Sequence, residues 1–191
     1  MPKISAPSVA EHRANQRAAL IRAGEDLLRD DGLASVMPRR VCERAGLSRS
    51  SFYDYFTTRD DLLVAIAIAA IEKWEAEIEE ELTGVDEGLP ALRVFVDATM
   101  AMTADGRHDI AGTLQAANLS PSRMEDLMVL HDTLLRPLIR ILSELDVANP
   151  VRAAMLVQGA LGAGVQLVTH GLDPQTVSDD VFRFVTKGLL A

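Results

Sequence analysis

A short stretch with helical spacing, RSSFYDYF, carries hydrogen-bonding groups along one face. They are Arg49, Ser50, Ser51, Tyr53, Asp54 and Tyr55. Arg49 stands at the start of the stretch, and its guanidinium can donate two parallel hydrogen bonds to guanine. Ser50, Ser51 and Asp54 can add direct or water-mediated contacts to other bases. The major groove of DNA is wide enough to admit such a helix, so this pattern predicts a surface that reads a duplex.

The residues around this stretch predict how it is held. Gly46 can enter the left-handed backbone region without steric cost, so a preceding helix can end in a sharp turn there. Ser48 is a suitable N-cap for the next helix, and we expect that helix to run through Phe52 and Phe56. These two aromatics lie four residues apart and would pack inward. The pattern predicts a helix-turn-helix, although an amphipathic hairpin inside an all-helical protein would look similar.

The charge distribution favours the first interpretation. The net charge is −9, which by itself argues against binding to phosphates. Residues 1–60, however, hold 10 Lys and Arg against 8 Asp and Glu, whereas residues 61–191 hold 9 against 20. The arginines in or beside the two motif helices are Arg39, Arg40, Arg44, Arg49 and Arg59. A basic cluster of this kind supports DNA binding, although it can also be a solvated face.

The composition is that of an ordinary intracellular protein. The 191 residues are 48% hydrophobic and include one cysteine, so a disulfide framework and a Cys/His zinc site are excluded within the chain. Cys42 has apolar neighbours and is expected in the core. The N-terminus lacks the apolar run of a signal peptide, and no uninterrupted apolar run reaches the ~18 residues of a membrane helix. We therefore expect a cytoplasmic protein without a membrane partner.

Apolar periodicity predicts about nine helices and no strands. The expected helical ranges are 9–30, 38–45, 48–56, 60–82, 90–103, 108–118, 120–145 with a kink at Pro137, a helix from 150, and a helix from 174. Residues 1–10 are expected to form a loose arm.

Two runs, RAALIRAGEDLLRDDGL and VCERAGLSRSSFYDYFTTRDDLL, resemble the DNA-binding head of the tetracycline-repressor (TetR) family of bacterial transcription regulators. The matching features are Gly32, the turn Ala45-Gly46-Leu47-Ser48, Phe52-Tyr53, Tyr55-Phe56, and Arg59 with the acid after it and Leu62. The resemblance implies an all-α fold with two domains. These are a three-helix DNA-binding head, residues 1–59, and a helical domain for ligand binding and dimerisation, residues 60–191.

The resemblance also implies roles for individual residues. It implies that Tyr53, Tyr55, Thr57 and Arg59 hold phosphates and fix the register on DNA. The chain departs from the family where Val36-Met37-Pro38 replaces a threonine that commonly opens the second helix, and Arg39 or Arg40 would replace its phosphate contact. Arg59 stands where lysine is commoner, and either cation can hold a phosphate. The predicted DNA-binding residues are Arg39, Arg40, Ser48, Arg49, Ser50, Ser51, Tyr53, Asp54, Tyr55, Thr57 and Arg59.

The helix expected from residue 150, with the run AAMLVQGALGAGVQLVTHG, is dense in glycine and alanine. So many glycines weaken a helix unless its backbone closely approaches another element. We expect a four-helix bundle between two subunits, as the resemblance implies; packing within one chain is the alternative. The predicted interface residues are Gly159, Gly162, Ala163, Gln166, Val181, Phe184 and Val185.

The helical domain also holds candidates for a small-molecule site, which is typically an apolar cavity with a few polar groups. They are Trp74, Phe95, Met100, His108, Gln115, Met124, Met128, His131, Met155 and Gln158. Each could equally be part of a plain core. No catalytic, cofactor or metal site is predicted, because no nucleophile, base and orienting group occur together around a motif.

The sequence therefore predicts a transcription regulator, a repressor released from a palindromic operator by a small apolar or amphipathic effector. It would act as a homodimer on double-stranded DNA and be nucleoid-associated when bound. One alternative is a helix-turn-helix architectural or protein-interaction factor without a small ligand. A helical enzyme is the second alternative.

Overall fold

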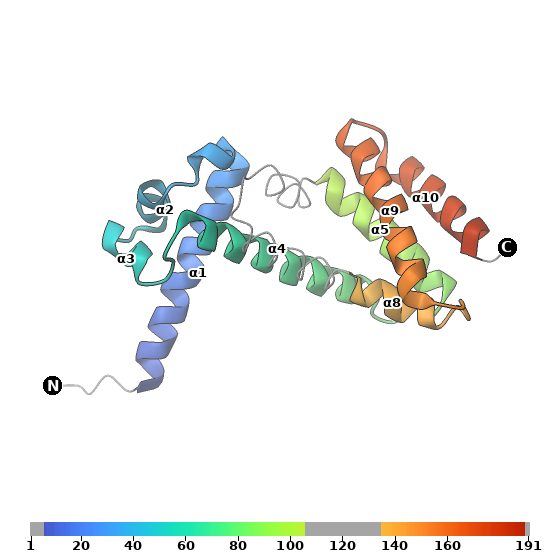
Figure 1. Cartoon of the computed structure of the whole chain (residues 1–191), viewed down its shortest axis with the longest axis horizontal. Helices are drawn as coiled ribbons and strands as arrows, with labels where there is room; N and C mark the ends of the chain where they lie inside the picture. Colours follow the sequence, from blue (N-terminus) through green and yellow to red (C-terminus); the bar gives the residue numbers. More distant parts are fainter. Residues whose placement is uncertain (1–5, 106–134, 190–191) are drawn as a thin grey trace. The chain divides into compact units, whose positions relative to one another are not determined.

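The computed structural model of the chain describes residues 6–105 and 135–189, and every regular element in these ranges is a helix (Figure 1). The helices are α1 (Ala6–Asp31), the 3-10 turn η1 (Leu33–Ser35), α2 (Pro38–Ala45), α3 (Arg49–Tyr53), α4 (Arg59–Glu81), α5 (Leu89–Ala104), α8 (Arg136–Ser143), α9 (Pro150–Thr169) and α10 (Pro174–Leu189). The all-α prediction is confirmed. The helix expected at 108–118, and residues 120–134 of the next one, lie outside the described residues.

The described residues group into two compact units, 6–70 and 71–105 with 135–189. The first unit, here called the head, contains α1, η1, α2, α3 and the first half of α4. The first turns of α4 group with the head because they pack against α1, and the domain boundary at residue 59 stays a prediction. A Cβ on Gly24 would lie only 2.7 Å from Cδ1 of Ile66 and 3.3 Å from Cδ2 of Leu62. Gly24 thus permits close packing of α1 against α4.

Local capping explains where the head helices begin and end. α2 has the predicted bounds, with Pro38 in its first turn and left-handed Gly46 after its last residue. α4 starts with a reciprocal cap, in which the Thr58 N–H donates to Asp61 Oδ2 at 2.8 Å and the Asp61 N–H donates to Thr58 Oγ1 at 3.1 Å. α1 begins at Ala6, earlier than expected, so the predicted loose arm over residues 1–10 is wrong from residue 6 onward.

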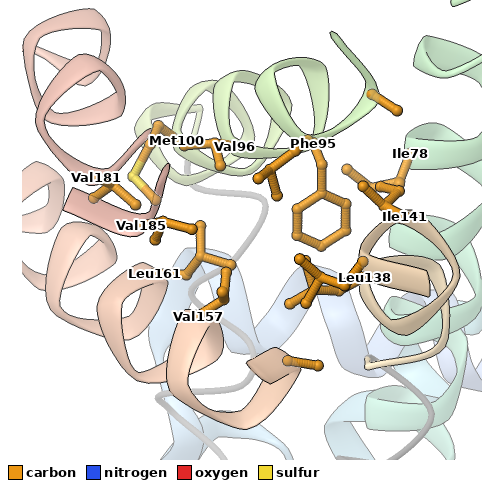
Figure 2. Close-up of a cluster of buried hydrophobic side chains, with 14 of the residues drawn as sticks. Ile78, Phe95, Val96, Met100, Leu138, Ile141, Val157, Leu161, Val181 and Val185 are labelled. Carbon is orange, nitrogen blue, oxygen red and sulfur yellow. The ribbon is translucent and has the colours of Figure 1, made fainter. Parts of the chain in front are cut away.

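The second unit is built around α5, which packs against α8, α9 and α10. Figure 2 shows side chains from these four helices, together with Ile78 of α4, meeting in one apolar cluster. Its most deeply buried members include Leu92, Val96, Leu138 and Leu142. Pro137 lies in the first turn of α8, where its missing N–H has no helical partner to lose, so it opens the helix described there.

A polar cluster fastens α10 to α5 at the edge of this core. Arg93 of α5 donates to Asp97 at 2.8 Å and to Asp179 of α10 at 2.6 Å, with its guanidinium 5.2 Å from the ring centre of Phe182. The buried Ser178 hydroxyl donates to Asp97. The Arg93 hydrogen bond lowers the pKa of Asp179. These contacts fix the orientation of α10.

Candidate nucleic-acid interface

The turn between α2 and α3 depends on Gly46. Its φ is +67°, a conformation that costs residues with a Cβ roughly 1–2 kcal/mol. The Leu47 N–H donates to the Cys42 carbonyl at 2.9 Å, which satisfies one of the free carbonyls at the end of α2. The left-handed turn predicted from the sequence is confirmed, and it joins α2 directly to α3 (Figure 1).

Two aromatic side chains anchor α3 in the head. Phe52 is fully buried and Phe56 is 3% exposed, and their ring centres lie 5.6 Å apart. The predicted helix through Phe56 is too long, because α3 ends at Tyr53 and the cap at Thr58 starts α4 soon afterwards. The Phe56 N–H still donates to the Phe52 carbonyl at 2.9 Å. One further helical turn therefore keeps both rings on the inner side.

The serines at the start of α3 do not act as predicted. Ser48 precedes the helix in an extended conformation, but its side chain makes no capping hydrogen bond. Its hydroxyl instead hydrogen-bonds to those of Ser50 at 2.8 Å and Ser51 at 2.9 Å. Hydroxyl groups can satisfy one another in this way, so they compete with the free backbone N–H groups as partners. The predicted cap is wrong, and the three hydroxyls form one small cluster at the helix start.

The outer face of α3 matches the prediction in exposure. Arg49, Ser50, Tyr53, Asp54 and Thr57 are exposed, and the ring-bearing Tyr53 is 56% exposed. Arg49 makes no hydrogen bond or ion pair within the part of the chain that the structure describes. Its donors therefore remain available for a partner molecule. The face combines a cation, hydroxyls and a carboxylate on α3 and the residues that follow it.

Tyr55 and Arg59, by contrast, are engaged inside the head. The Tyr55 hydroxyl donates to Gln16 Oε1 of α1 at 2.7 Å. Arg59 donates from Nε to the Val36 carbonyl at 2.8 Å and from Nη2 to the Leu33 carbonyl at 2.7 Å. Arg59 thus ties the start of α4 to the segment before α2. Neither side chain presents all its donors to a phosphate in this structure, so their phosphate contacts stay a prediction.

The arginines of α2 are exposed but already have carboxylate partners. Arg39 pairs with Glu43 at 2.8 Å, Arg40 with Asp31 at 2.6 Å, and Arg44 with Asp30 at 2.9 Å. The hydrogen bond that Arg39 donates to Glu43 raises the pKa of Arg39, and the one that Arg44 donates to Asp30 raises the pKa of Arg44. The guanidiniums lie where a phosphate could reach them, but their charge is balanced within the head.

Residues of α1 also belong to this region, and sequence reasoning missed them. Arg13 lies with its guanidinium 5.5 Å from the ring centre of Tyr55, and Arg17 lies 5.5 Å from that of Phe56. Their four-residue spacing indicates a shared helix face. The contact with aromatics so far along the chain becomes visible only in the folded head.

Cys42 is 1% exposed, which confirms its expected place in the core. Burial raises the pKa of its thiol, partly opposed by a backbone hydrogen bond from Phe52. The protonated thiol is a poor nucleophile, so this cysteine is an inert part of the packing between α2 and α3.

In the second unit the candidate ligand residues differ in burial. Phe95 and Met100 are buried in the apolar cluster, and Trp74 packs edge-on against Phe95 with ring centres 5.8 Å apart. Gln158 is half-buried. Met155 is 61% exposed among the described residues, and its predicted place in a ligand site stays a prediction. The candidates His108, Gln115, Met124, Met128 and His131 lie outside the described residues.

The small-residue face of α9 is divided between two surroundings. A Cβ on Gly164 would lie 2.9 Å from Val181 and 3.1 Å from Met100, so this glycine permits close packing within the chain. Gly159, Gly162, Ala163 and Gln166 are exposed, as is Phe184 of α10 at 73%. Val181 and Val185 are 7% and 5% exposed. These two valines fill the core between α5, α9 and α10 (Figure 2), and the predicted subunit interface stays a prediction.

α9 carries a further row of exposed apolar side chains. They are Val151, Met155, Leu156 and Leu167. By length and composition alone the helix could cross a membrane, with a mean hydropathy of 1.4 over 18 residues and 33% of that window buried. Its inner side packs on α5, α8 and α10, so α9 combines a core face with an uncovered apolar face.

One family model matches part of the head, and several solved structures match most of the chain. Residues 20–66 match the family model described as bacterial regulatory proteins, tetR family. The fatty acid degradation regulator FadR from Bacillus halodurans is 17% identical, with a TM-score of 0.72 over 91% of this chain and 96% of that one. FadR from Bacillus subtilis, solved in complex with stearoyl-CoA, is 17% identical, with a TM-score of 0.74 over 90% and 98%.

A regulator of the TetR/AcrR family from Thermobifida fusca YX-ER1 is 19% identical, with a TM-score of 0.66 over 91% of this chain and 98% of that one. The comparison with curated proteins gives no match. At these identities the solved structures establish a common fold, and the matched segment covers the second half of α1, η1, α2, α3 and the first turns of α4. Residues 20–66 are thus similar to the helix-turn-helix segment of the tetR family of bacterial regulatory proteins, and the chain shares the all-helical fold of the TetR/AcrR-family regulator from Thermobifida fusca.

Proposed function

We propose that the chain is a homodimeric repressor that binds a palindromic operator and leaves it when a small apolar or amphipathic effector binds. The observation that carries the proposal is the outer face of α3, where Arg49 has no partner among the described residues and Ser50, Tyr53 and Asp54 are exposed beside it. A helix with such a face fits the major groove, and its polar side chains can reach base edges.

A dimer follows from the uncovered apolar face of the second unit. Leu156 is 71% exposed, Phe184 is 73% exposed, and Gly159 and Gly162 between them leave the α9 backbone open to close approach. Apolar side chains this exposed favour burial against a partner. A second copy offers the same small and apolar residues, which makes the face self-complementary under a two-fold axis. Two heads would then enter successive major grooves about 34 to 36 Å apart.

The effector class is supported by composition and by one neighbour. The second unit has an apolar core that contains Phe95 and Met100, and Trp74 packs against it. The FadR structure from Bacillus subtilis holds stearoyl-CoA, a molecule with a long apolar chain and a charged head. An effector of this amphipathic kind suits an apolar site with few polar groups. We extend the ligand class, and not that individual ligand, to this chain.

α4 can couple effector binding to DNA binding, because its first half belongs to the head and its second half to the second unit. A ligand that prefers a dimer with misplaced heads lowers operator affinity by its differential affinity, commonly about 1 to 3 kcal/mol. Operator release then needs no direct contact between effector and DNA.

The test begins with selection of bound sequences from a random duplex library, which is expected to return a palindrome. Arg49→Ala is expected to relax the preference at one base pair of each half-site, since a bidentate contact contributes about 1–3 kcal/mol of discrimination. Arg140→Ala, which removes the same charge from α8 in the second unit, is the control and is expected to leave the preference intact. Recovery of dispersed sequences without a two-fold pattern would favour an architectural role instead.

A further inference from the structure

The three arginines of α2 share an arrangement that Arg49 of α3 lacks: each is paired with a carboxylate of the same head. The pairs are Arg39–Glu43, Arg40–Asp31 and Arg44–Asp30, with separations of 2.8, 2.6 and 2.9 Å. All six side chains are exposed, from 38% for Arg44 to 76% for Arg39. Three exposed ion pairs thus cover the outer side of the first helix of the helix-turn-helix.

Helix electrostatics explains why two of these acids need a cation. Asp30 and Asp31 are the last residues of α1, where the helix dipole disfavours negative charge. Arg40 and Arg44 are one turn apart on α2, and α2 packs against α1. Arg40 and Arg44 therefore each offset an acid at an unfavourable position. Arg39 instead pairs with Glu43, one turn further along α2.

We propose that Asp30, Asp31 and Glu43 compete with DNA phosphates for the α2 arginines, so that the head engages DNA by exchanging these partners. The inference rests on the proposed function. In helix-turn-helix complexes the first helix crosses the sugar–phosphate backbone, so the guanidiniums that now face carboxylates would face phosphates. Both partners accept hydrogen bonds from the same donors, and one guanidinium fork cannot serve both fully.

The exchange lowers affinity in two ways. Each arginine must give up its carboxylate, and the released carboxylate then lies near a phosphate of the same charge. Because exposed ion pairs are individually weak, we expect removal of one competing acid to tighten DNA binding roughly two- to fivefold. The slope of log affinity against log salt is expected to steepen by up to about 0.9 for each additional phosphate that an arginine neutralises.

The experiment measures binding of the full chain to a mixed-sequence DNA duplex by fluorescence anisotropy across a salt series. Non-specific binding is chosen because it reports phosphate contacts and needs no knowledge of the operator. The variants are Asp31→Asn and Glu43→Gln, which remove charge and keep shape. Glu25→Gln is the control, because Glu25 pairs with Arg29 at 3.1 Å within α1 and its loss changes the net charge of the head equally. Thermal melting verifies that each variant is folded.

A double-mutant cycle separates competition from simple removal of negative charge. Asp31→Asn is expected to tighten binding in the wild-type background and to have no effect in an Arg40→Ala background. Equal tightening in both backgrounds, or tightening of the same size by Glu25→Gln, would show general repulsion and overturn the inference. Weaker binding by Asp31→Asn would also overturn it, because the carboxylate would then be orienting the arginine. If the wild-type chain binds no duplex at any salt, the proposed function fails first; if it binds and the variants bind no more tightly, only this inference fails.

Discussion

Replacing Arg59 by alanine is expected to destabilise the head before it affects DNA binding. The resemblance to family members implies a phosphate contact for this residue, yet its guanidinium donates to the carbonyls of Val36 at 2.8 Å and Leu33 at 2.7 Å. Val36 is fully buried and Arg59 is half-buried. Arg59→Ala removes both donors and leaves the two carbonyls without this partner.

The magnitude follows from the type of bond. A hydrogen bond from a charged donor contributes about 1.5–3 kcal/mol, and access of water to the half-exposed guanidinium reduces the sum for the pair to roughly 2–4 kcal/mol. For a chain of this size, 1 kcal/mol lowers the melting temperature by about 2–4 °C, so the expected fall is roughly 4–16 °C. Arg59→Lys is expected to lie between, because an ammonium group retains charge but not the fork that reaches both carbonyls.

The assay is thermal unfolding of the full chain followed by circular dichroism, with DNA affinity measured well below the transition. Arg49→Ala is the matched control, because Arg49 is exposed and makes no hydrogen bond with the described residues. It is expected to change stability by less than about 0.5 kcal/mol while weakening operator binding. If Arg59→Ala melts like the wild type but binds every duplex more weakly with a shallower salt slope, Arg59 is chiefly a phosphate ligand and the reasoning from its carbonyl contacts is refuted.

Three further predictions concern the turn, the subunit contact and acid stability. Gly46→Ala is expected to cost roughly 1–2 kcal/mol in urea unfolding because of its φ of +67°, whereas Gly188→Ala, with nothing within 4 Å, is expected to be neutral or slightly stabilising; equal effects would contradict the backbone argument. Phe184→Asp is expected to give a folded monomer by sedimentation velocity, and Met37→Asp, at an exposed apolar residue of the head, to remain dimeric; a dimeric Phe184→Asp would exclude this face. Hydrogen bonds from Thr176 lower the pKa of Asp173, which precedes α10, below its usual 3.8. The stabilising contribution of Asp173 is therefore full above pH 3.8 and is lost as the pH falls through the lower pKa of the folded state. An Asp173→Asn variant with the wild-type acid-unfolding profile would show that this carboxylate contributes nothing.

Helix boundaries in the head are predictable where a single start or stop residue sets them. Pro38 and Gly46 mark the two ends of α2, and the structure has both ends at these residues. The helical spacing of Phe52 and Phe56 predicts that α3 continues through Phe56. α3 ends earlier because the reciprocal cap of Thr58 and Asp61 begins α4 soon afterwards. Spacing shows which side a residue faces, and here it does not show where hydrogen bonding ends the helix.

The direction of long polar side chains is not predictable from the sequence. Tyr55 and Arg59 both belong to a motif that resembles a DNA-binding head, but their partners Gln16 and Val36 lie far away along the chain. The residues of the proposed dimer face are only partly predictable for a similar reason. Periodicity identifies an apolar stripe on α10 but cannot tell Val181, which the core buries, from Phe184, which remains exposed.

Cys42 is the single cysteine of the chain. Because it is buried on α2, its reactivity reports local opening of the head. An alkylating reagent can reach the sulfur only when the head locally unfolds, so the rate of modification of the unaltered protein gives the free energy of that opening. Bound DNA that holds the head closed is expected to slow alkylation in proportion to occupancy. Mass spectrometry of the alkylated chain would then follow operator binding without any attached dye.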